Sequence, residues 1–332
     1  MGAQLAPIRS TSVQYVDDVD RSLAALRAMG SEVGASADLV EHMCLVAAEL
    51  GHNVVRHGGG GTVEIRTLSR EGVVGIEVLA RDFGGGIVDP TQAFGGVSSG
   101  TGLGAGLGTA LRFSHELFID SRVGDGTRIW SRRFDGTVST MPQFAIVGRP
   151  FPGEGVSGDD ALLVPRNEEV LFAICDGLGH GPDARIASKR AIEAVSARLD
   201  SPIPVLIEHA DVSSVGTRGA VISVGRYHHP GRSLEVAGLG NVNGEVWSRR
   251  GIRSHVLPRG GMLGGRTRVS QGPSPHAVAR HPGDIVLLFS DGLRSSIAVP
   301  PAMWAMPAVV IAHQLLMTHC RDNDDATILV IK

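Results

Sequence analysis

The chain is long enough for two domains and has the composition of a globular protein. It has 332 residues, of which 42% are hydrophobic and 20% are charged, whereas a compact domain typically has about 100 to 200 residues. This composition argues against a disordered chain. A formal net charge of −3 provides no basic field that would gather nucleic acid or an anionic membrane surface. Protein and small-molecule partners therefore fit better than nucleic acid.

Neither the cysteines nor the N-terminus indicate export. The three cysteines, Cys44, Cys175 and Cys320, are far apart and form no CxxC pair, which suits a reducing compartment. No apolar stretch approaches the roughly 18 residues that a membrane span needs. The N-terminus also lacks a basic region followed by an apolar run. We therefore expect a cytoplasmic protein that does not associate with membranes.

Hydrophobic periodicity predicts an α+β fold for the first part of the chain. Apolar residues recur at helical spacing over 16–29 and 37–52, and Ser36 can cap the second of these helices. A helix is also expected at 109–113. Together with the strands, these segments predict helices packed on an antiparallel or mixed sheet. The alternating runs that predict strands lie at 62–68, 73–80, 115–121 and 127–134.

The second part of the chain is richer in strands. The polar, turn-forming segment DGTVSTMPQ at 135–143 places the domain boundary near 138–142, giving domains at 1–137 and 138–332. Many strands with few helices predict a β-sandwich flanked by helices. Helices are expected at 182–199, 202–209 and 301–317, and strands at 144–150, 160–165, 169–175, 219–227, 233–240, 245–250, 284–290 and 326–332.

Four motifs in the first domain have the chemistry of a nucleotide site. In AAELGHNVV, Glu49 and Asn53 are four residues apart and so share one helix face. A carboxylate there can accept a hydroxyl proton, and an amide oxygen can bind Mg²⁺; alternatively, this is a solvated helix face. In RDFGGG, Asp82 directly follows an apolar strand and can accept a hydrogen bond from an exocyclic amine.

The other two motifs are a glycine-rich stretch and a turn. SSGTGLGAGLGTAL at 98–111 precedes an expected helix, where exposed backbone N–H groups can hold phosphate. A glycine-rich loop taken alone is weak support, because a mobile loop has the same composition. In GDGTRI, Thr127 can donate to a phosphate or simply shape a hairpin.

These four motifs, in this order, resemble the GHKL ATPase superfamily, in particular the anti-sigma-factor serine kinases and RsbT-like switch kinases. The resemblance covers nearly all of the first 134 residues. It implies that Glu49 is the general base, Asn53 the Mg²⁺ ligand and Asp82 the adenine-binding residue. No histidine-bearing helix pair precedes the domain, which favours protein serine as the phosphoryl acceptor. The nucleotide cradle implied by the resemblance comprises Gly84, Gly86, Gly102, Leu103, Gly104 and Gly106.

The second domain places carboxylates at the ends of four predicted strands. Asp159 lies in VSGDDALL, Asp176 in FAICDGLGHG and Asp291 in LLFSDGL, while Asp324 and Asp325 precede the last strand. Carboxylates anchored at strand ends can hold two divalent ions that activate water and neutralise a phosphoryl group. An Asp-Gly pair alone more often marks an ordinary turn. Four such positions together favour a metal centre.

The order GDD, DGLGHG, SDGL and DDAT resembles the SpoIIE/RsbX branch of the PPM phosphatases, across about residues 143–332. It implies that Asp325 lies beside the metal ligands rather than among them. His180 can touch the phosphate or merely turn its loop, and Asn241 and Asn243 are explained as turn residues. The ligands of Mn²⁺ or Mg²⁺ implied by the resemblance are Asp159, Asp176, the Gly177 carbonyl, Asp291 and Asp324.

The two resemblances together predict a bifunctional switch enzyme. ATP with Mg²⁺ would serve the first domain and two Mn²⁺ or Mg²⁺ ions the second. Phosphosites on STAS-type anti-sigma antagonists or stressosome-like proteins are the expected targets, and a homodimer is a further expectation from the resemblance. One alternative keeps the phosphatase but makes the first domain a nucleotide-sensing or partner-binding module without turnover. A purely structural scaffold is the third alternative.

Overall fold

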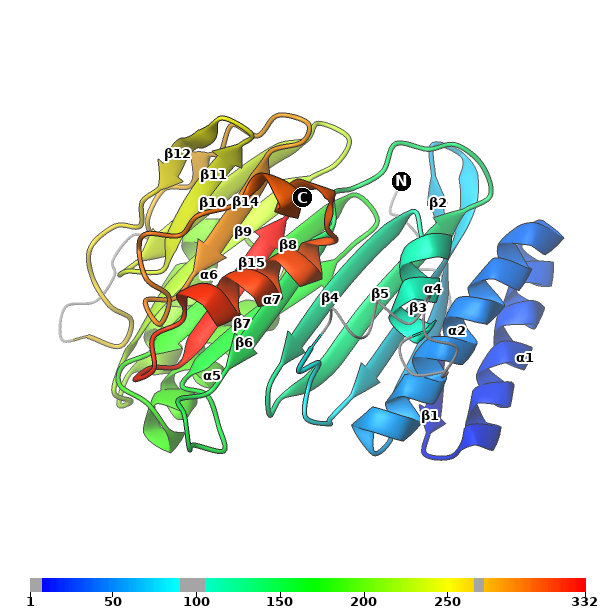
Figure 1. Cartoon of the computed structure of the whole chain (residues 1–332), viewed down its shortest axis with the longest axis horizontal. Coiled ribbons are helices and arrows are strands. Elements are labelled where there is room, and N and C mark those ends of the chain that lie inside the picture. The colour runs from blue at the N-terminus through cyan, green and yellow to red at the C-terminus, as the bar shows by residue number, and fades with distance from the viewer. Residues whose placement is uncertain (1–7, 90–104, 266–271) are drawn as a thin grey trace. The chain divides into compact units, whose positions relative to one another are not determined.

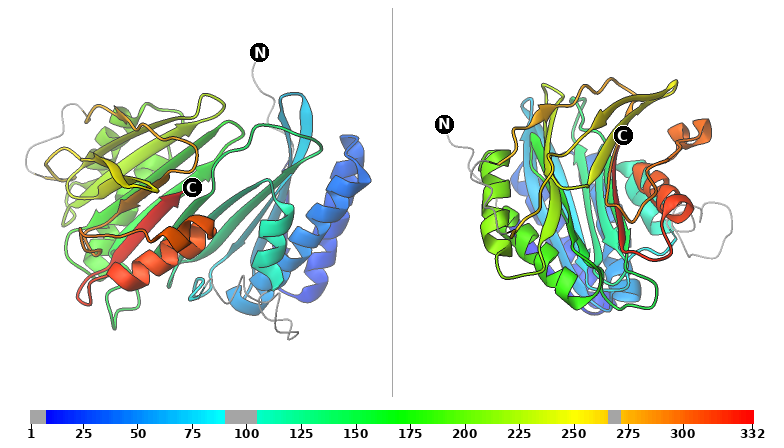
Figure 2. Two further views of the ribbon diagram at one scale, coloured as in Figure 1. Left: turned by 45° about the horizontal axis from the view of Figure 1, so that its top comes forward. Right: turned by 90° about the vertical axis from the view of Figure 1, so that its left-hand side faces the viewer.

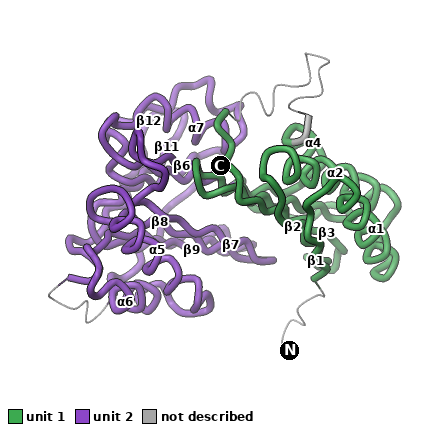
Figure 3. Tube along the Cα trace, turned by 90° about the horizontal axis from the view of Figure 1, so that it is seen from below, with its two compact units in different colours: residues 1–143 green, residues 144–332 purple. Residues whose placement is uncertain are grey.

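The computed structural model describes residues 8–89, 105–265 and 272–332, and its elements are labelled in Figure 1. The chain divides into two compact units, residues 1–143 and 144–332, which Figure 3 distinguishes by colour. No helix in the described ranges has the length and apolar composition needed to cross a membrane.

The first unit is a layer of helices on one face of a sheet (Figure 1). Its strands follow the order β1-β2-β3-β5-β4 and pair antiparallel, which is one of the two arrangements that the sequence left open. The α+β class is therefore confirmed. The elements are β1 (Ile8–Val13), α1 (Val16–Glu32), α2 (Ala37–Gly58), β2 (Gly61–Arg70), β3 (Val73–Asp82), α4 (Ala105–Phe113), β4 (Glu116–Arg122) and β5 (Gly126–Phe134).

Helix α2 is specified by its cap, its apolar face and its terminating glycine. The Ser36 hydroxyl accepts a hydrogen bond from the Leu39 N–H at 3.1 Å, and Gly59 ends the helix in the left-handed conformation with φ 65°. Met43, Val46, Leu50 and Val54 follow the three- and four-residue spacing of one face and are buried. The helix thereby fixes the direction in which its polar residues project.

A buried set of ion pairs joins four strands of this sheet. Arg132 on β5 pairs with Glu77 on β3 and with Glu116 on β4, and Arg70 on β2 also pairs with Glu116. Glu116 accepts a further hydrogen bond from the Met141 N–H at 2.7 Å. Because a buried charge without its partner is costly, these pairs specify the strand register and hold the segment that follows β5.

The second unit is a sandwich of two antiparallel sheets. One sheet has the order β6-β15-β14-β11-β12 and the other the order β13-β10-β9-β8-β7. The elements are β6 (Phe144–Arg149), β7 (Asp159–Pro165), β8 (Glu169–Gly177), α5 (Pro182–Ser196), α6 (Ile203–Ser214), β9 (Ala220–His228), β10 (Ser233–Leu239), β11 (Asn243–Ser248), β12 (Gly251–Val256), β13 (His276–Ala277), β14 (Ile285–Phe289), η1 (Pro301–Ala305), α7 (Ala308–His319) and β15 (Ala326–Ile331).

Aromatic side chains join the two sheets, and helices cover their outer faces. Phe144 on β6 packs against Phe172 on β8 and Tyr227 on β9, with ring centroids 5.8 and 5.9 Å apart. Helices α5 and α6 pack on the sheet that contains β8, and α7 packs on the other sheet (Figure 2). The predicted β-sandwich flanked by helices is therefore confirmed.

The structure differs from the sequence prediction at several elements. The helix expected at 301–317 is interrupted, because Pro307 separates the 3₁₀ turn η1 from α7 and proline breaks a helix interior. Strand β1 was not predicted, since its sequence IRSTSV has few apolar residues and its side chains are largely exposed. Strands β12 and β13 were missed for the same reason: few of their side chains are buried.

The Ser36 cap gives a test of how α2 is held. Ser36→Ala removes the acceptor for the Leu39 N–H and should destabilise the first turn of α2 by about 1 kcal/mol. The matched control is Ser31→Ala, an exposed serine inside α1, for which we expect less than about 0.5 kcal/mol. Hydrogen exchange of the α2 amides measures both changes. Equal effects of the two substitutions would contradict a capping role for Ser36.

Candidate active sites

The four predicted carboxylate positions of the second unit lie at strand ends. Asp159 begins β7 and faces Asp176 near the end of β8, where the two residues are register partners. Asp291 follows β14 and Asp324 precedes β15, which are neighbouring antiparallel strands. The topology thus brings together aspartates that are up to 165 residues apart in the sequence.

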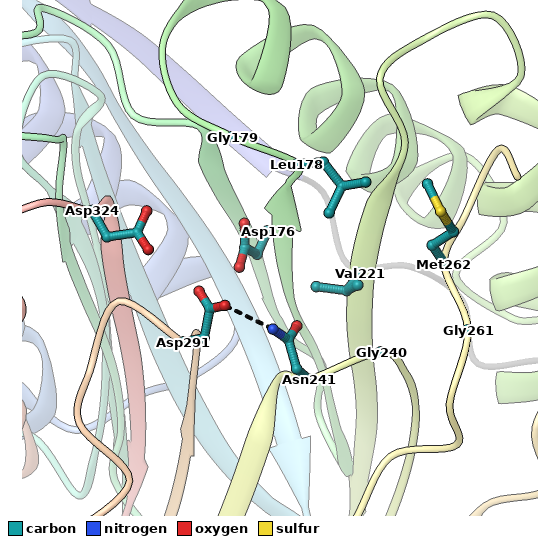
Figure 4. Close-up of a pocket in the computed structure, with 10 residues that line it drawn as sticks. All are labelled: Asp176, Leu178, Gly179, Val221, Gly240, Asn241, Gly261, Met262, Asp291 and Asp324. Carbon is teal, nitrogen blue, oxygen red and sulfur yellow. Dashed lines mark hydrogen bonds between the residues drawn. The ribbon is translucent and has the colours of Figure 1, made fainter.

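Three of these aspartates line one cavity of about 450 Å³. The carboxylates of Asp176, Asp291 and Asp324 lie on the same side of it and point toward a common space (Figure 4). The backbone that carries them is the rigid edge of a sandwich, so their positions are set by the fold.

Asp159 is buried beside this cavity. Its Oδ2 accepts a hydrogen bond from the Ser290 hydroxyl at 2.7 Å, and its backbone carbonyl accepts one from the Arg185 guanidinium at 2.8 Å. Its Oδ1 is also buried and has no hydrogen-bond partner among the described residues. A buried carboxylate oxygen left in this way is costly unless something else binds it.

The carboxylates oppose one another's ionisation. Burial raises the pKa of Asp176 far above its ordinary value, and repulsion from Asp159 and Asp291 adds to the rise. Burial likewise raises the pKa of Asp159, with repulsion from Asp325 and Asp324 adding to it, and burial with repulsion from Asp291 raises the pKa of Asp324. Such a cluster of hard oxygen donors is suited to divalent cations, which would replace the protons.

The carboxylates do not by themselves form a finished coordination shell. Within the described ranges, no three acidic, histidine or cysteine side chains are gathered closely enough to hold a metal ion. The donor types and the unpartnered Asp159 oxygen nevertheless fit hard divalent ions such as Mg²⁺ and Mn²⁺.

Gly177, whose carbonyl is a predicted metal ligand, and Asp325, predicted to lie beside the ligands, are both fixed by close contacts. A Cβ built on Gly177 would lie 2.0 Å from the Ala184 carbonyl oxygen, so only glycine permits this approach of β8 to α5. Asp325 is buried, and its Oδ1 accepts a hydrogen bond from the Phe151 N–H at 2.7 Å. That bond ties the segment after β6 to the strand end that carries Asp324.

The structure changes the interpretation of two polar residues near this site, Asn241 and His180. Asn241, which the sequence explained only as a turn residue, lines the cavity and donates from Nδ2 to Asp291 Oδ2 at 2.7 Å (Figure 4). The available signal was its place directly after the apolar run of β10. His180 is largely exposed; its Nδ1 pairs with Glu154 and its ring stacks on Phe151, so the structure gives it a role in holding its loop.

In the first unit, Asp82 lies at the end of β3 with one oxygen already engaged. Its Oδ1 accepts the backbone N–H groups of Gly84 at 2.9 Å and Thr127 at 3.2 Å. This arrangement orients the carboxylate and leaves Oδ2 to accept from an amine. Burial raises the pKa of Asp82, and the two backbone hydrogen bonds oppose the rise.

The last turn of α2 packs directly against this carboxylate. A Cβ built on Gly58 would lie 2.2 Å from the Asp82 Cβ, and one built on Gly84 would lie 2.4 Å from the His57 carbonyl oxygen. The glycines therefore let α2 approach the turn that follows β3. Because Asn53 lies four residues before His57 on the same helix, the fold brings two of the predicted motifs together.

The remaining predicted residues of the first unit differ in their exposure, their hydrogen bonds and their place in the fold. Glu49 and Asn53 are both partly exposed, one turn apart on α2. The Thr127 hydroxyl is buried and hydrogen-bonds with the Ser121 hydroxyl at 3.0 Å, which suits the hairpin-shaping alternative. Gly86 follows Asp82 in the turn after β3, and Gly106 lies in the first turn of α4, whereas Gly102, Leu103 and Gly104 lie outside the described residues.

The raised pKa of Asp176 predicts that removing its charge stabilises the metal-free protein. A raised folded-state pKa means that the metal-free protein loses stability as pH rises from the ordinary value of 3.8 toward the raised one. Asp176→Asn lacks this loss, so at pH 8 in EDTA it should be more stable by at least about 1 kcal/mol. The gain should vanish near pH 4.

Urea unfolding of the full chain at both pH values measures this effect. Asp200→Asn is the matched control, because Asp200 is exposed, pairs with Arg166 and has a lowered pKa; it should give no gain at pH 8. An Asp176→Asn protein no more stable than the wild type at pH 8 would show that burial and the neighbouring carboxylates do not disfavour the charged form of Asp176.

Comparisons with known proteins match two different families to two parts of the chain. The sequence profile of the histidine kinase-like ATPase domain matches residues 14–132, and that of stage II sporulation protein E (SpoIIE) matches residues 166–332. Serine/threonine-protein kinase RsbT of Bacillus subtilis (strain 168) is 31% identical over 104 residues, which are 31% of this chain and 78% of RsbT.

Two further matches are a curated phosphatase and a solved structure. Phosphoserine phosphatase RsbX of Bacillus subtilis (strain 168) is 26% identical over 141 residues, which are 42% of this chain and 69% of RsbX. A solved structure from work on the bacterial stressosome, a modular system adapted to control secondary messenger signalling, has a TM-score of 0.53 and 25% identity. That match covers 58% of this chain and 100% of the other.

The SpoIIE match spans half of the chain, and the chain covers more than two thirds of RsbT at over 30% identity. The chain therefore belongs to the SpoIIE family, with an RsbX-like PPM phosphatase domain that follows an RsbT-like GHKL domain of the histidine kinase-like ATPase family.

Proposed function

We propose that the chain is a bifunctional switch enzyme that sets the phosphorylation level of a STAS-type protein. Residues 1–137 would transfer phosphate from ATP to a serine or threonine, and residues 138–332 would remove it from that protein or a related one. The observation that carries the phosphatase half is the cavity in which Asp176, Asp291 and Asp324 converge beside the buried Asp159. The chain is similar both to a kinase and to a phosphatase, and this double similarity supports the pairing of the two activities.

The phosphatase half assigns the acidic residues to metal binding. Two Mn²⁺ or Mg²⁺ ions, held by Asp159, Asp176, Asp291, Asp324 and the Gly177 carbonyl, would supply positive charge for the phosphoryl group and activate water. The chain's own contribution is to fix these oxygens at strand ends. Ser290 orients Asp159 and Asn241 orients Asp291 through hydrogen bonds of 2.7 Å each, so both carboxylates are held in place.

The kinase half assigns three residues to ATP and its acceptor. Asp82 Oδ2 would accept a hydrogen bond from the adenine amine, since Oδ1 is held by Gly84 and Thr127. Asn53 would hold Mg²⁺, and Glu49, one turn earlier on α2, would take the proton from the attacking hydroxyl. STAS-type partners are proposed because one similar solved structure comes from stressosome work.

Two substitutions should move the phosphorylation of a STAS-domain protein in opposite directions. Glu49→Gln should slow transfer from ATP by about 10²- to 10⁴-fold, because it removes a general base, while ATP affinity stays within a few fold. Asp176→Asn should instead raise the steady-state phosphorylation, because removal of the phosphate is lost. Radiolabelled ATP with candidate STAS-domain proteins measures both.

Matched controls come from the same helix and the same unit. Glu41→Gln changes an exposed glutamate two turns before Glu49 on α2, and Asp200→Asn changes an exposed aspartate; neither should alter the phosphorylation level. Unchanged transfer in Glu49→Gln would rule out the kinase half as described. ATP binding without transfer by the wild type would select a first domain that senses nucleotide without turnover.

A further inference from the structure

The cavity of the phosphatase unit has a second wall that carries no charge. Leu178, Val221 and Met262 line it, and Figure 4 shows them on the side away from the carboxylates. Leu178 directly follows the strand end that carries Asp176, and it is 39% exposed. Leaving an apolar side chain exposed at the mouth of a polar site costs free energy, so a wall of this kind indicates a binding surface.

The backbone directly after Met262 is held in place. Leu263 and Ala220 exchange two backbone hydrogen bonds, at 2.7 and 3.3 Å. The Gly264 N–H donates to Oδ1 of the buried Asp211 on α6 at 2.8 Å. Met262 is therefore presented to the cavity by a pinned segment, as a residue that reads a ligand must be.

Glycines keep the apolar side of the cavity clear. Gly240 lines it with φ 108°, and a Cβ there would lie 2.1 Å from Val221 Cγ1. A Cβ on Gly219 would lie 2.3 Å from Met262 Cε. A side chain at either glycine would push into the apolar wall, so the shape of this wall depends on both.

The geometry sets what this wall can touch in a phosphorylated protein. When the phosphoryl group of a phosphoserine lies at the carboxylates, its single methylene connects it directly to the backbone. Successive side chains of an extended chain point to opposite faces, so the side chain that shares the phosphoserine's face belongs to the residue two positions before or after it, about 7 Å along the chain. The apolar wall adjoins the carboxylates within the same cavity, and it is therefore placed to meet that side chain.

We propose that Leu178, Val221 and Met262 form a specificity subsite that accepts an apolar side chain two residues before or after the phosphorylated serine or threonine of a protein substrate. This inference rests on the proposed phosphatase function and names its substrate class: phosphosites with an apolar flanking residue. An apolar pocket discriminates by removing apolar surface from water, which a polar side chain of the same size cannot match.

Matched phosphoserine peptides test this subsite on the full chain with Mn²⁺. The peptides carry Leu or the similarly sized Asn, either two residues before or two residues after the phosphoserine. At one of the two positions, kcat/KM should be at least about tenfold higher for Leu than for Asn. Met262→Gln should reduce this ratio to about threefold or less, and Leu178→Gln should do the same. Met317→Gln, which changes a methionine that is 61% exposed on α7, should keep the full ratio.

The outcomes distinguish failure of the subsite from failure of the proposed phosphatase function. Hydrolysis of all peptides without a preference for Leu at either position would overturn the subsite and leave the phosphatase in place. A preference that persists in both Met262→Gln and Leu178→Gln would overturn it as well. If no phosphopeptide is hydrolysed, the proposed phosphatase function fails, and the subsite fails with it.

Discussion

Burial of several mutually repelling aspartates in the second unit is the constraint on which the site depends. A sandwich edge gathers Asp159, Asp176, Asp291 and Asp324, and burial there raises the pKa of three of them. A chain that only needed to fold would gain by replacing such groups with apolar or neutral ones. Divalent cations at the proposed site would convert this mutual repulsion into shared coordination.

Contacts between the two sheets hold the aspartates in place. The Phe144, Phe172 and Tyr227 contact joins the two sheets, and the hydrogen bond from Ser290 to Asp159 crosses between the same two sheets at their edge. Stability from the apolar core thus offsets the cost of the acidic edge. The same edge also presents an apolar wall, so one cavity would combine the proposed phosphate chemistry with a surface that binds the protein around the phosphate.

The proposed adenine site of the first unit relies on one oriented carboxylate rather than on a cluster of them. It holds one carboxylate oxygen of Asp82 with two backbone N–H groups and brings α2 against it through Gly58. A neutral adenine amine needs a single oriented acceptor, whereas a phosphoryl group needs positive charge. The proposed function would place two kinds of phosphate chemistry, transfer from ATP and hydrolysis, on one chain.

Sequence patterns predicted those parts of the molecule that depend on local order. Ser36 could be predicted as a cap, and both the α+β unit and the sandwich follow from periodicity. Asn241 could not be distinguished from a turn residue, because its role depends on Asp291, which lies 50 residues away. Leu178 and Met262 were missed because the wall they form exists only after distant loops meet. The helix expected at 301–317 was wrong, since apolar spacing outweighed the breaking effect of Pro307.

Calorimetric titration of the full chain with Mn²⁺, in the absence of ATP, tests the central claim most directly. Two ions should bind per chain, with a heat that changes with the ionisation enthalpy of the buffer, because binding displaces protons from Asp176 and Asp159. Asp291→Asn should lose at least one ion. Absence of saturable binding, or a stoichiometry unchanged in Asp291→Asn, would contradict a metal centre built from these carboxylates.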